Sequence, residues 1–162
     1  MPRCCWVYNS LRSTIRLPPP SGGNLQSTME KPLPIITSDS APFWDGCRNG
    51  QLLLQCCTPC GAWRYPPGPV CLRCGSLEST RATASGRGTI HSFVVYHRAF
   101  HPSYVDEIPY AMALIDLAEG VRMVLRVVEC SVEAIAIGMA GEIQFRKVTE
   151  EIWVPAFVPI PL

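Results

Sequence analysis

The 162-residue sequence lacks a long apolar segment: it has no run of about 18 apolar residues, so no membrane-spanning helix is predicted. It also lacks an excess of charge, because 14 basic residues are balanced by 13 acidic ones. The net charge of +1 offers no broad attraction for nucleic acid or anionic lipid. No nucleophile elbow or phosphate-binding loop is present, so no motif predicts catalysis by this chain alone.

The first 28 residues lack acidic side chains altogether. They also lack the apolar core of about 7–15 residues that a secretory signal needs. Pro18–Pro20 and the Gly22-Gly23 pair oppose regular structure. Three interpretations stay open: an extension upstream of a native start at Met29, which we favour, an Arg- and Ser-rich transit peptide, and a disordered tail. In each case residues 1–38 are expected to lie outside the folded domains.

Cysteine, in contrast, is abundant, with nine residues in the chain. An odd number cannot pair completely, and four of the nine fall into two C-x-x-C units. Free thiols persist best in a reducing compartment, which predicts a cytoplasmic protein. The cysteines without an evident partner are Cys4, Cys5, Cys47, Cys56 and Cys130.

Both C-x-x-C units are followed by glycine, and this pattern predicts a metal site. Each unit places two sulfurs on one turn, and the glycine permits the positive φ that turns backbone N–H groups toward the thiolates. Two such units complete a tetrahedron with no open position, so we predict one structural zinc ion per chain. Iron and a pair of disulfides are the alternatives. Cys56 lies outside the repeated register and is a potential competitor. The predicted ligands are Cys57, Cys60, Cys71 and Cys74.

Hydrophobic spacing predicts one helical segment ahead of the cysteines. The helical pattern begins at Pro42 and extends toward Leu54, with Ser40 as the N-cap. Gly50 is expected to end the helix. Residues 52–54 then read as a short strand that leads into the first cysteine unit.

Beyond Gly75 the pattern becomes β-rich. Five strands are predicted at residues 89–96, 111–117, 121–128, 143–148 and 153–158. The turn at Glu119-Gly120 joins the second and third into a hairpin, and residues 131–135 read as one helical turn. In the first strand, one face is assigned to Ile90, Val94 and Tyr96 and the other to His91, Phe93 and Val95.

Five strands with a central hairpin favour a small Greek-key barrel of the OB type. The expected fold class is therefore mainly β, with a short helical segment at its start. The expected division of the chain is 1–38 as extension or disorder, 39–55 as the helical segment, 56–78 as the zinc ribbon and 79–162 as the barrel.

Several short motifs resemble those of one protein family. They are Phe43-Trp44-Asp45-Gly46, residues 50–55, both C-x-x-C-G units, Tyr65-Pro66-Pro67, residues 85–90, His97, His101-Pro102, Pro109-Tyr110 and Ile137-Gly138-Met139. Over residues 40–158 the chain resembles the zinc-ribbon plus OB-fold family of acyl-CoA-associated proteins. The resemblance implies a rubredoxin-like ribbon followed by an OB-fold barrel.

The same resemblance implies a function. Members are similar in acting as non-catalytic accessory subunits of thiolase-superfamily enzymes, that is, of thiolases, acyltransferases or retro-aldolases, within hetero-oligomers, and some help to hold acyl-CoA. Two positions depart from the pattern: Cys56 replaces a basic or polar residue, and Gly68 replaces an arginine. The second departure weakens the case for direct contact with acyl-CoA.

Six residues are candidates for contact with acyl-CoA or a partner protein. An arginine between two glycines suits phosphate, although a solvent-facing side chain at a strand bulge is the alternative. The histidines suit a channel or simply tie a loop to the barrel, and the aromatic residues suit an interface or the core. The same choice applies to Trp44, Trp153 and Phe157. The six candidates are Arg87, His97, Arg98, His101, Trp63 and Tyr65.

Two other functions stay open. Ribbons and OB barrels both serve in nucleic-acid binding, although the charge balance argues against it here. A stand-alone acyl-CoA-binding protein or CoA-dependent enzyme is the remaining alternative.

Overall fold

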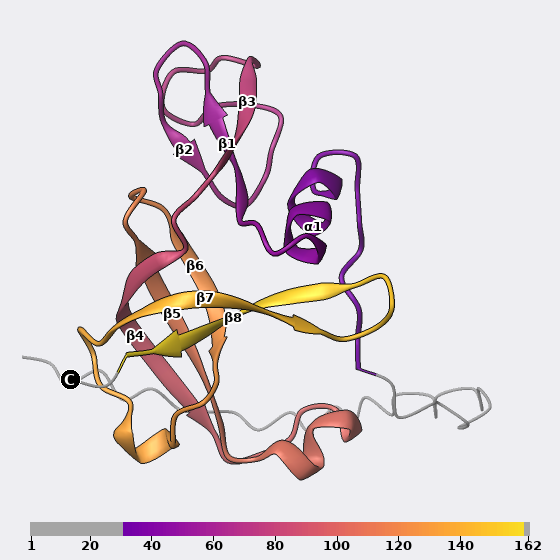
Figure 1. Ribbon diagram of the computed structural model, residues 1–162, viewed down its shortest axis with the longest axis vertical. Helices are drawn as coiled ribbons and strands as arrows, with labels where there is room; N and C mark the ends of the chain where they lie inside the picture. Colours follow the sequence, from indigo (N-terminus) through magenta and orange to yellow (C-terminus); the bar gives the residue numbers. More distant parts are fainter. Residues whose placement is uncertain (1–30, 161–162) are drawn as a thin grey trace, which may run out of the picture.

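The computed structural model of the chain describes residues 31–160, so the interpretations of residues 1–28 lie outside the described residues. A short helix, α1 (Ala41–Arg48), leads into a small three-stranded sheet, and a closed barrel follows (Figure 1). No helix within residues 31–160 is long and apolar enough to cross a bilayer.

Helix α1 begins and ends close to the predicted signals. Ser40 occupies the N-cap position, but its hydroxyl accepts a hydrogen bond from Thr37 N–H at 2.9 Å and does not cap the helix. Gly50 adopts a φ of +72°, and the N–H of the following residue donates to Gly46 O at 2.8 Å. This Schellman-type closure ends α1 at Arg48, and Gly50 stops the helix as predicted.

The ribbon sheet consists of β1 (Leu53–Cys57), β2 (Trp63–Arg64) and β3 (Ser79–Thr83), in the order β2-β1-β3. Both neighbours run antiparallel to β1. Strand β3 was not predicted, because it is mostly exposed and carries no alternation of apolar and polar residues. Its pairing with β1 places residues 79–83 in the ribbon sheet, although the sequence division assigns them to the barrel.

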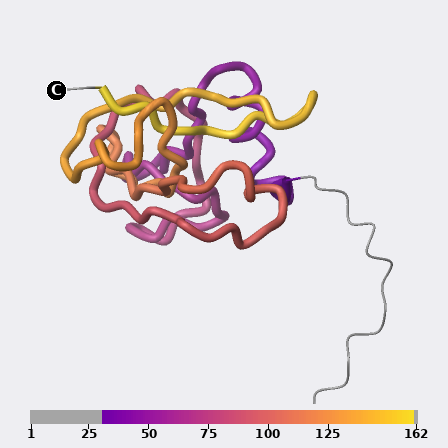
Figure 2. Tube along the Cα trace, turned by 90° about the horizontal axis from the view of Figure 1, so that it is seen from below, coloured from indigo at the N-terminus to yellow at the C-terminus, as the bar shows by residue number. Residues whose placement is uncertain are grey.

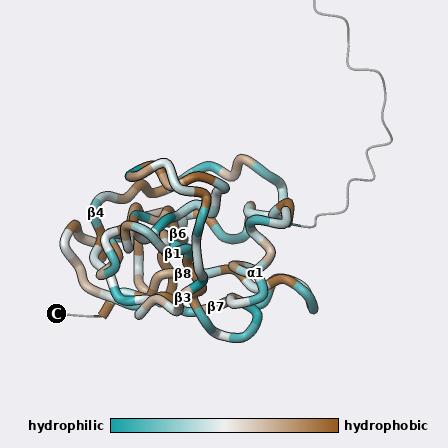
Figure 3. The backbone as a smooth tube through the Cα atoms, turned by 90° about the horizontal axis from the view of Figure 1, so that it is seen from above, coloured by the Kyte–Doolittle hydropathy of each residue, from teal (hydrophilic) through white to brown (hydrophobic). Residues whose placement is uncertain are grey.

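Five strands close into a barrel in the order β4-β5-β6-β8-β7. They are β4 (Arg87–Tyr96), β5 (Tyr110–Leu117), β6 (Arg122–Val127), β7 (Ala140–Lys147) and β8 (Trp153–Pro159). All five correspond to predicted strands, and the fold class is confirmed. Alternation along β5 and β6 buries every second residue, and hydrophobic and hydrophilic stretches recur along the chain (Figure 3).

The predicted faces of β4 are wrong beyond its midpoint. Its pairing with β5 shifts register at His91, where a β-bulge inserts one residue. Ile90 is 1% exposed, as predicted, but Val94 is 48% exposed. The extra residue reverses the alternation, so Val95 packs against the core while Val94 and Tyr96 lie on the outer face. A bulge leaves no mark in the hydrophobic pattern, which is why the sequence did not reveal it.

Glycines permit the close approach of strands where the barrel closes. A Cβ atom on Gly88 would lie 2.6 Å from Asp116 O, and one on Gly141 would lie 2.4 Å from Val158 O. Both distances are below any ordinary contact, so the β4–β5 and β7–β8 pairings depend on the absence of a side chain at these positions.

Helix α1 joins the ribbon to the barrel, because it packs against β1 on one side and against β7 and β8 on the other. Phe43 and Cys47 of α1 share one core with Leu54 of β1 and Phe157 of β8. Phe157 is 0% exposed, so it is a core residue and not part of an interaction surface. Burial of such a side chain stabilises the fold by about 2–3 kcal/mol.

Candidate metal centre and contact residues

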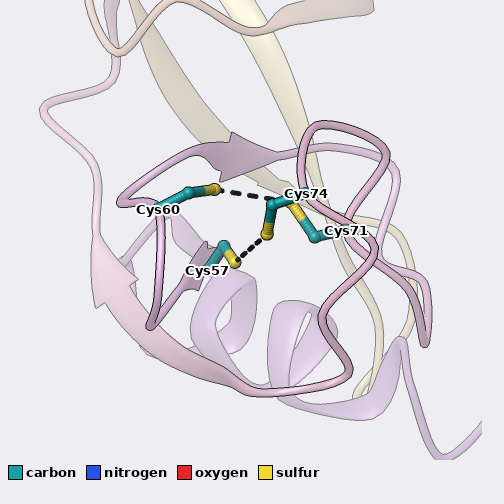
Figure 4. Close-up of side chains that lie close together, drawn as sticks. All are labelled: Cys57, Cys60, Cys71 and Cys74. Carbon is teal, nitrogen blue, oxygen red and sulfur yellow. Dashed lines mark hydrogen bonds between the residues drawn. The ribbon is translucent and has the colours of Figure 1, made fainter.

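Two tight turns bring the four predicted ligands together. Cys57 is the last residue of β1, and Cys60 follows in the same turn; Cys71 and Cys74 occupy the second turn (Figure 4). The Sγ atoms of Cys57 and Cys74 lie 3.5 Å apart, and those of Cys60 and Cys71 lie 3.7 Å apart. All four sulfurs lie within 4.8 Å of one another.

The two turns repeat one backbone pattern. Gly61 N–H donates to Cys57 O at 2.8 Å, and Gly75 N–H donates to Cys71 O at 2.8 Å. These glycines adopt φ values of +67° and +75°, in the left-handed region that favours glycine. Because neither would meet any atom if a Cβ were added, backbone conformation and not space explains the glycine at each position.

The spacing of the sulfurs fits a tetrahedral metal site. Four thiolates bound at about 2.3 Å from one ion lie about 3.8 Å apart along each edge of the tetrahedron. The observed 3.5 and 3.7 Å separations are close to this edge and far from the roughly 2.05 Å of a disulfide. All four cysteines are free thiols, so the structure does not contain the alternative pair of disulfides.

The thiols of this site differ in how readily they lose a proton. Backbone hydrogen bonds from Arg73 and Cys74 lower the pKa of Cys71 to about 6. A backbone hydrogen bond at Cys60 also favours the Cys57 thiolate, but burial and the neighbouring thiols outweigh it and raise the pKa of Cys57 to about 12. Four thiolates this close repel one another, so a divalent cation is what allows all of them to ionise together.

Cys56 lies outside the group of four. Its thiol contacts Gly61 O at 3.6 Å, whereas the sulfur of the neighbouring Cys57 belongs to the metal group. Adjacent residues of a strand point to opposite faces, which separates the two side chains. The concern that Cys56 competes for the metal therefore finds no support in this geometry.

The other predicted contact residues do not form one site. Arg87 is exposed at the start of β4, opposite Glu142 of β7, while its N–H donates to Ser85 Oγ. His97 and Arg98 are exposed just beyond the end of β4. Figure 1 shows the ribbon and the loop after β4 at opposite ends of the molecule.

His101 has a local structural contact. Its Nδ1 accepts a hydrogen bond from Ser103 N–H at 3.2 Å, which caps the short 3₁₀-helix η1 (Pro102–Glu107). On the ribbon, Trp63 packs against the common core, and Tyr65 lies 5.5 Å from the ring of Phe43. Burial, and then the nearby Cys47 thiol, raise the pKa of Tyr65.

A groove of about 900 Å³ on the outer side of the barrel was not predicted. We call it the tyrosine groove. Its tyrosines come from separate segments of the chain, so no sequence motif marks the groove. The outward direction of Tyr96 also depends on the bulge in β4, which the sequence did not reveal. Residues that define it are Trp44, Tyr65, Tyr96, Tyr104, Tyr110 and Arg126.

A polar cluster on the opposite half of β5 was also not predicted. The Asp116 carboxylate pairs with His91 Nδ1 at 2.9 Å and accepts a hydrogen bond from Arg122 Nε at 2.5 Å. The bond from Arg122 is the largest influence, and, together with that from His91, it outweighs burial and lowers the pKa of Asp116.

Two protein-family models match the chain. Residues 44–79 match the rubredoxin-like zinc ribbon domain of ChsH2, and residues 82–146 match the C-terminal OB-fold domain of ChsH2. The boundary between the two matches falls within β3.

Similar proteins include subunits and scaffolds. A probable enoyl-CoA hydratase alpha subunit from Thermomonospora curvata is 35% identical over 80% of this chain, and the match covers only 40% of that protein. A DUF35 domain-containing scaffold protein from Methanothermobacter thermautotrophicus is 37% identical over 59% of this chain and 71% of its own length. The chain of an Ltp2-ChsH2(DUF35) aldolase structure is 35% identical with a TM-score of 0.72, covering 78% of this chain and 98% of that one.

Proposed function

Because this chain belongs to the DUF35 family of ChsH2-type proteins, in which a rubredoxin-like zinc ribbon precedes an OB-fold domain, we propose that it is a non-catalytic accessory subunit of a thiolase-superfamily enzyme. The partner would be a thiolase, an acyltransferase or a retro-aldolase, and the two would form a hetero-oligomer. The chain contributes shape and stability to the complex, and the partner contributes the reacting groups.

One observation carries this proposal. The match to the ChsH2(DUF35) chain of the aldolase covers 98% of that chain at 35% identity. The ribbon, the helix and the barrel together thus correspond to the whole of a component whose structure is known within a two-component aldolase. The free thiols of Cys47, Cys56 and Cys130 support a reducing compartment such as the cytoplasm for this assembly.

Co-expression tests the proposal. We expect the gene of the partner to lie nearby. That thiolase-superfamily enzyme is to be produced with and without this chain, and its soluble yield and turnover of acyl-CoA are to be measured. We expect yield or turnover to depend on the chain. Full solubility and full activity of the enzyme on its own would contradict the proposed accessory role.

We further propose that the metal is zinc, with Cys57, Cys60, Cys71 and Cys74 as its four ligands. The tetrahedral spacing and the thiolate-only donor set support this assignment. A closed four-cysteine site has no position for water, so the ion acts as a structural staple for a ribbon too small to supply its own core.

Metal analysis of two serine variants tests this assignment. Wild-type protein is expected to contain about one zinc per chain. Cys60→Ser should lose zinc and melt at a lower temperature, because one of four ligands is removed. Cys56→Ser is the matched control, since Cys56 lies beside the site but outside it, and it should keep its zinc. Equal zinc content in the two variants, or iron in the wild type, would refute the assignment.

Direct contact with acyl-CoA is the finer part of the proposal. Arg87 and Arg98 are exposed guanidinium groups of the kind that bind phosphate in pairs of hydrogen bonds. Titration calorimetry with CoA should detect binding that weakens in Arg87→Ala or Arg98→Ala. Binding that is unchanged in both variants would remove these residues from the contact.

A further inference from the structure

The tyrosine groove lies where OB barrels usually receive their ligands. Outward side chains of β5 and β6, such as Met112 and Val124, form its floor. One end is bounded by the loop between β4 and β5, at residues 97–109, and the other by the loop between β7 and β8, at residues 148–152. The face of the second and third barrel strands, between these two loops, is the general binding surface of OB folds.

A proline-containing segment of the chain itself forms one wall of this groove. Residues 31–34 read Lys-Pro-Leu-Pro and have no regular secondary structure. The Lys31 ammonium forms an ion pair with Glu107 and lies 5.6 Å from the centre of the Tyr104 ring. Leu33 reaches the other loop, where it borders a smaller cavity with Val148. Figures 1 and 2 both show the start of the described chain beside the loop that carries η1.

The aromatic rings form a continuous surface beside this segment. Tyr96 and Tyr110 are stacked, with ring centres 5.0 Å apart, and Tyr104 lies 5.8 Å from Tyr110. The Arg126 guanidinium lies 5.0 Å from the Tyr110 ring. Grooves lined by aromatic rings recognise extended proline-rich peptides, because such peptides lose little conformational entropy on binding.

The charges around the groove are largely neutralised, which argues against a polyanionic ligand. Lys31 and Arg126 share the Glu107 carboxylate, Arg146 pairs with Glu129 and Lys147 pairs with Glu150. Single-stranded nucleic acid needs a groove of unpaired cations beside its stacking rings. Glu107 instead supplies a carboxylate that suits one basic side chain.

We propose that the tyrosine groove binds an extended, proline-containing peptide segment with one basic residue, and that residues 31–34 hold the subsite for that residue until such a segment replaces them. That this peptide segment belongs to the partner enzyme rests on the proposed function. The groove volume left beside residues 31–34 is about 900 Å³, which lies within the range of ligand sites.

A fluorescent peptide with the sequence of residues 31–36 tests the site in the full-length chain. Wild-type protein should bind it weakly, because its own segment competes. Lys31→Ala removes the ion pair and the ring contact of that segment, and the peptide should then bind about fivefold more tightly by fluorescence anisotropy. The control is Arg48→Ala, which breaks a surface ion pair with Asp45 and should behave like wild type, because neither residue lines the groove.

The specificity of the site is tested in the Lys31→Ala background. Adding Glu107→Gln should weaken binding of the lysine peptide but not of a peptide with norleucine in place of lysine, whereas Tyr110→Ala should weaken binding of both peptides.

Absence of peptide binding in every variant, or peptide binding that neither change affects, would overturn the proposal. So would an oligothymidylate that binds the groove and that the peptide fails to displace. If the peptide fails while the enzyme still co-purifies with the chain, the accessory role stands and this inference falls.

Discussion

At the scale of single residues, Cys47 shows how burial changes the reactivity of a thiol. Cys47 is completely buried in the core, and burial raises its pKa to about 12, although a backbone hydrogen bond opposes the shift. Because the thiolate is the reactive form, Cys47 should be inert toward alkylating reagents.

Mass spectrometry after iodoacetamide treatment at pH 8 checks this expectation. In the native protein Cys47 should stay unmodified while the partly exposed Cys130 is alkylated, and denaturant should make both react. Alkylation of Cys47 at the rate of Cys130 in the native state would show that the helix does not shield it.

Asp116 predicts a dependence of stability on pH. Its pKa is lower in the folded protein, chiefly because of the hydrogen bond from Arg122, so the stabilisation is complete above the ordinary pKa near 4 and is lost as the pH falls through the folded value. Melting temperatures measured between pH 5 and pH 3 should therefore fall more steeply in the wild type than in Asp116→Asn. Parallel curves would mean that the ion pairs of Asp116 contribute nothing to stability.

At the scale of elements, the closure of the barrel depends on Gly88. A Cβ atom there would lie 2.6 Å from Asp116 O and 2.8 Å from the Ile115 side chain. Gly88→Ala should lower the free energy of unfolding by about 1–3 kcal/mol, since it forces β4 away from β5.

Gly68→Ala is the matched control for this change. Gly68 has a negative φ, and no atom lies within 4 Å of an added Cβ, so the free energy of unfolding should stay within about 0.5 kcal/mol of the wild-type value. Urea denaturation of the two variants measures the difference. If both cost the same, the close approach of β4 and β5 is not what requires glycine.

The elements also show what a sequence can and cannot predict. Strands β5 and β6 follow strict alternation and were predicted nearly to their ends, because one face of each is buried. The outward direction of Tyr96 was not predictable, since one inserted residue at His91 reverses every side chain after it. Likewise β3 pairs with β1 but is mostly exposed, so it carries no apolar pattern that the sequence could reveal.

The candidate site residues likewise include a part that the sequence predicts and a part that it does not. The four cysteines were predicted as a group because two turns of fixed spacing bring the sulfurs together within each unit. The six other candidates had no such local constraint, and the structure spreads them from the ribbon to the far end of the barrel. The tyrosine groove depends on tertiary contacts between distant segments, including residues 31–34, which no short motif encodes.

At the scale of the whole molecule, the ribbon and the barrel share one core through α1. Loss of the proposed zinc ion should therefore destabilise the barrel as well as the ribbon. In Cys60→Ser we expect the barrel to unfold in the same transition as the ribbon, at a lower temperature, because Phe43 and Leu54 bridge the two. Separate calorimetric transitions for the ribbon and the barrel would show that the common core does not couple them.

The central claim, that this chain is an accessory subunit, is tested most directly by the mass of the particle that it forms. The chain is to be co-expressed and purified with the proposed thiolase-superfamily partner. The mass is to be measured by light scattering during gel filtration, with zinc determined in the same fractions. The account predicts one hetero-oligomer that contains both proteins and about one zinc per copy of this chain. Two separate peaks, each with a single protein and with the enzyme fully active alone, would contradict it.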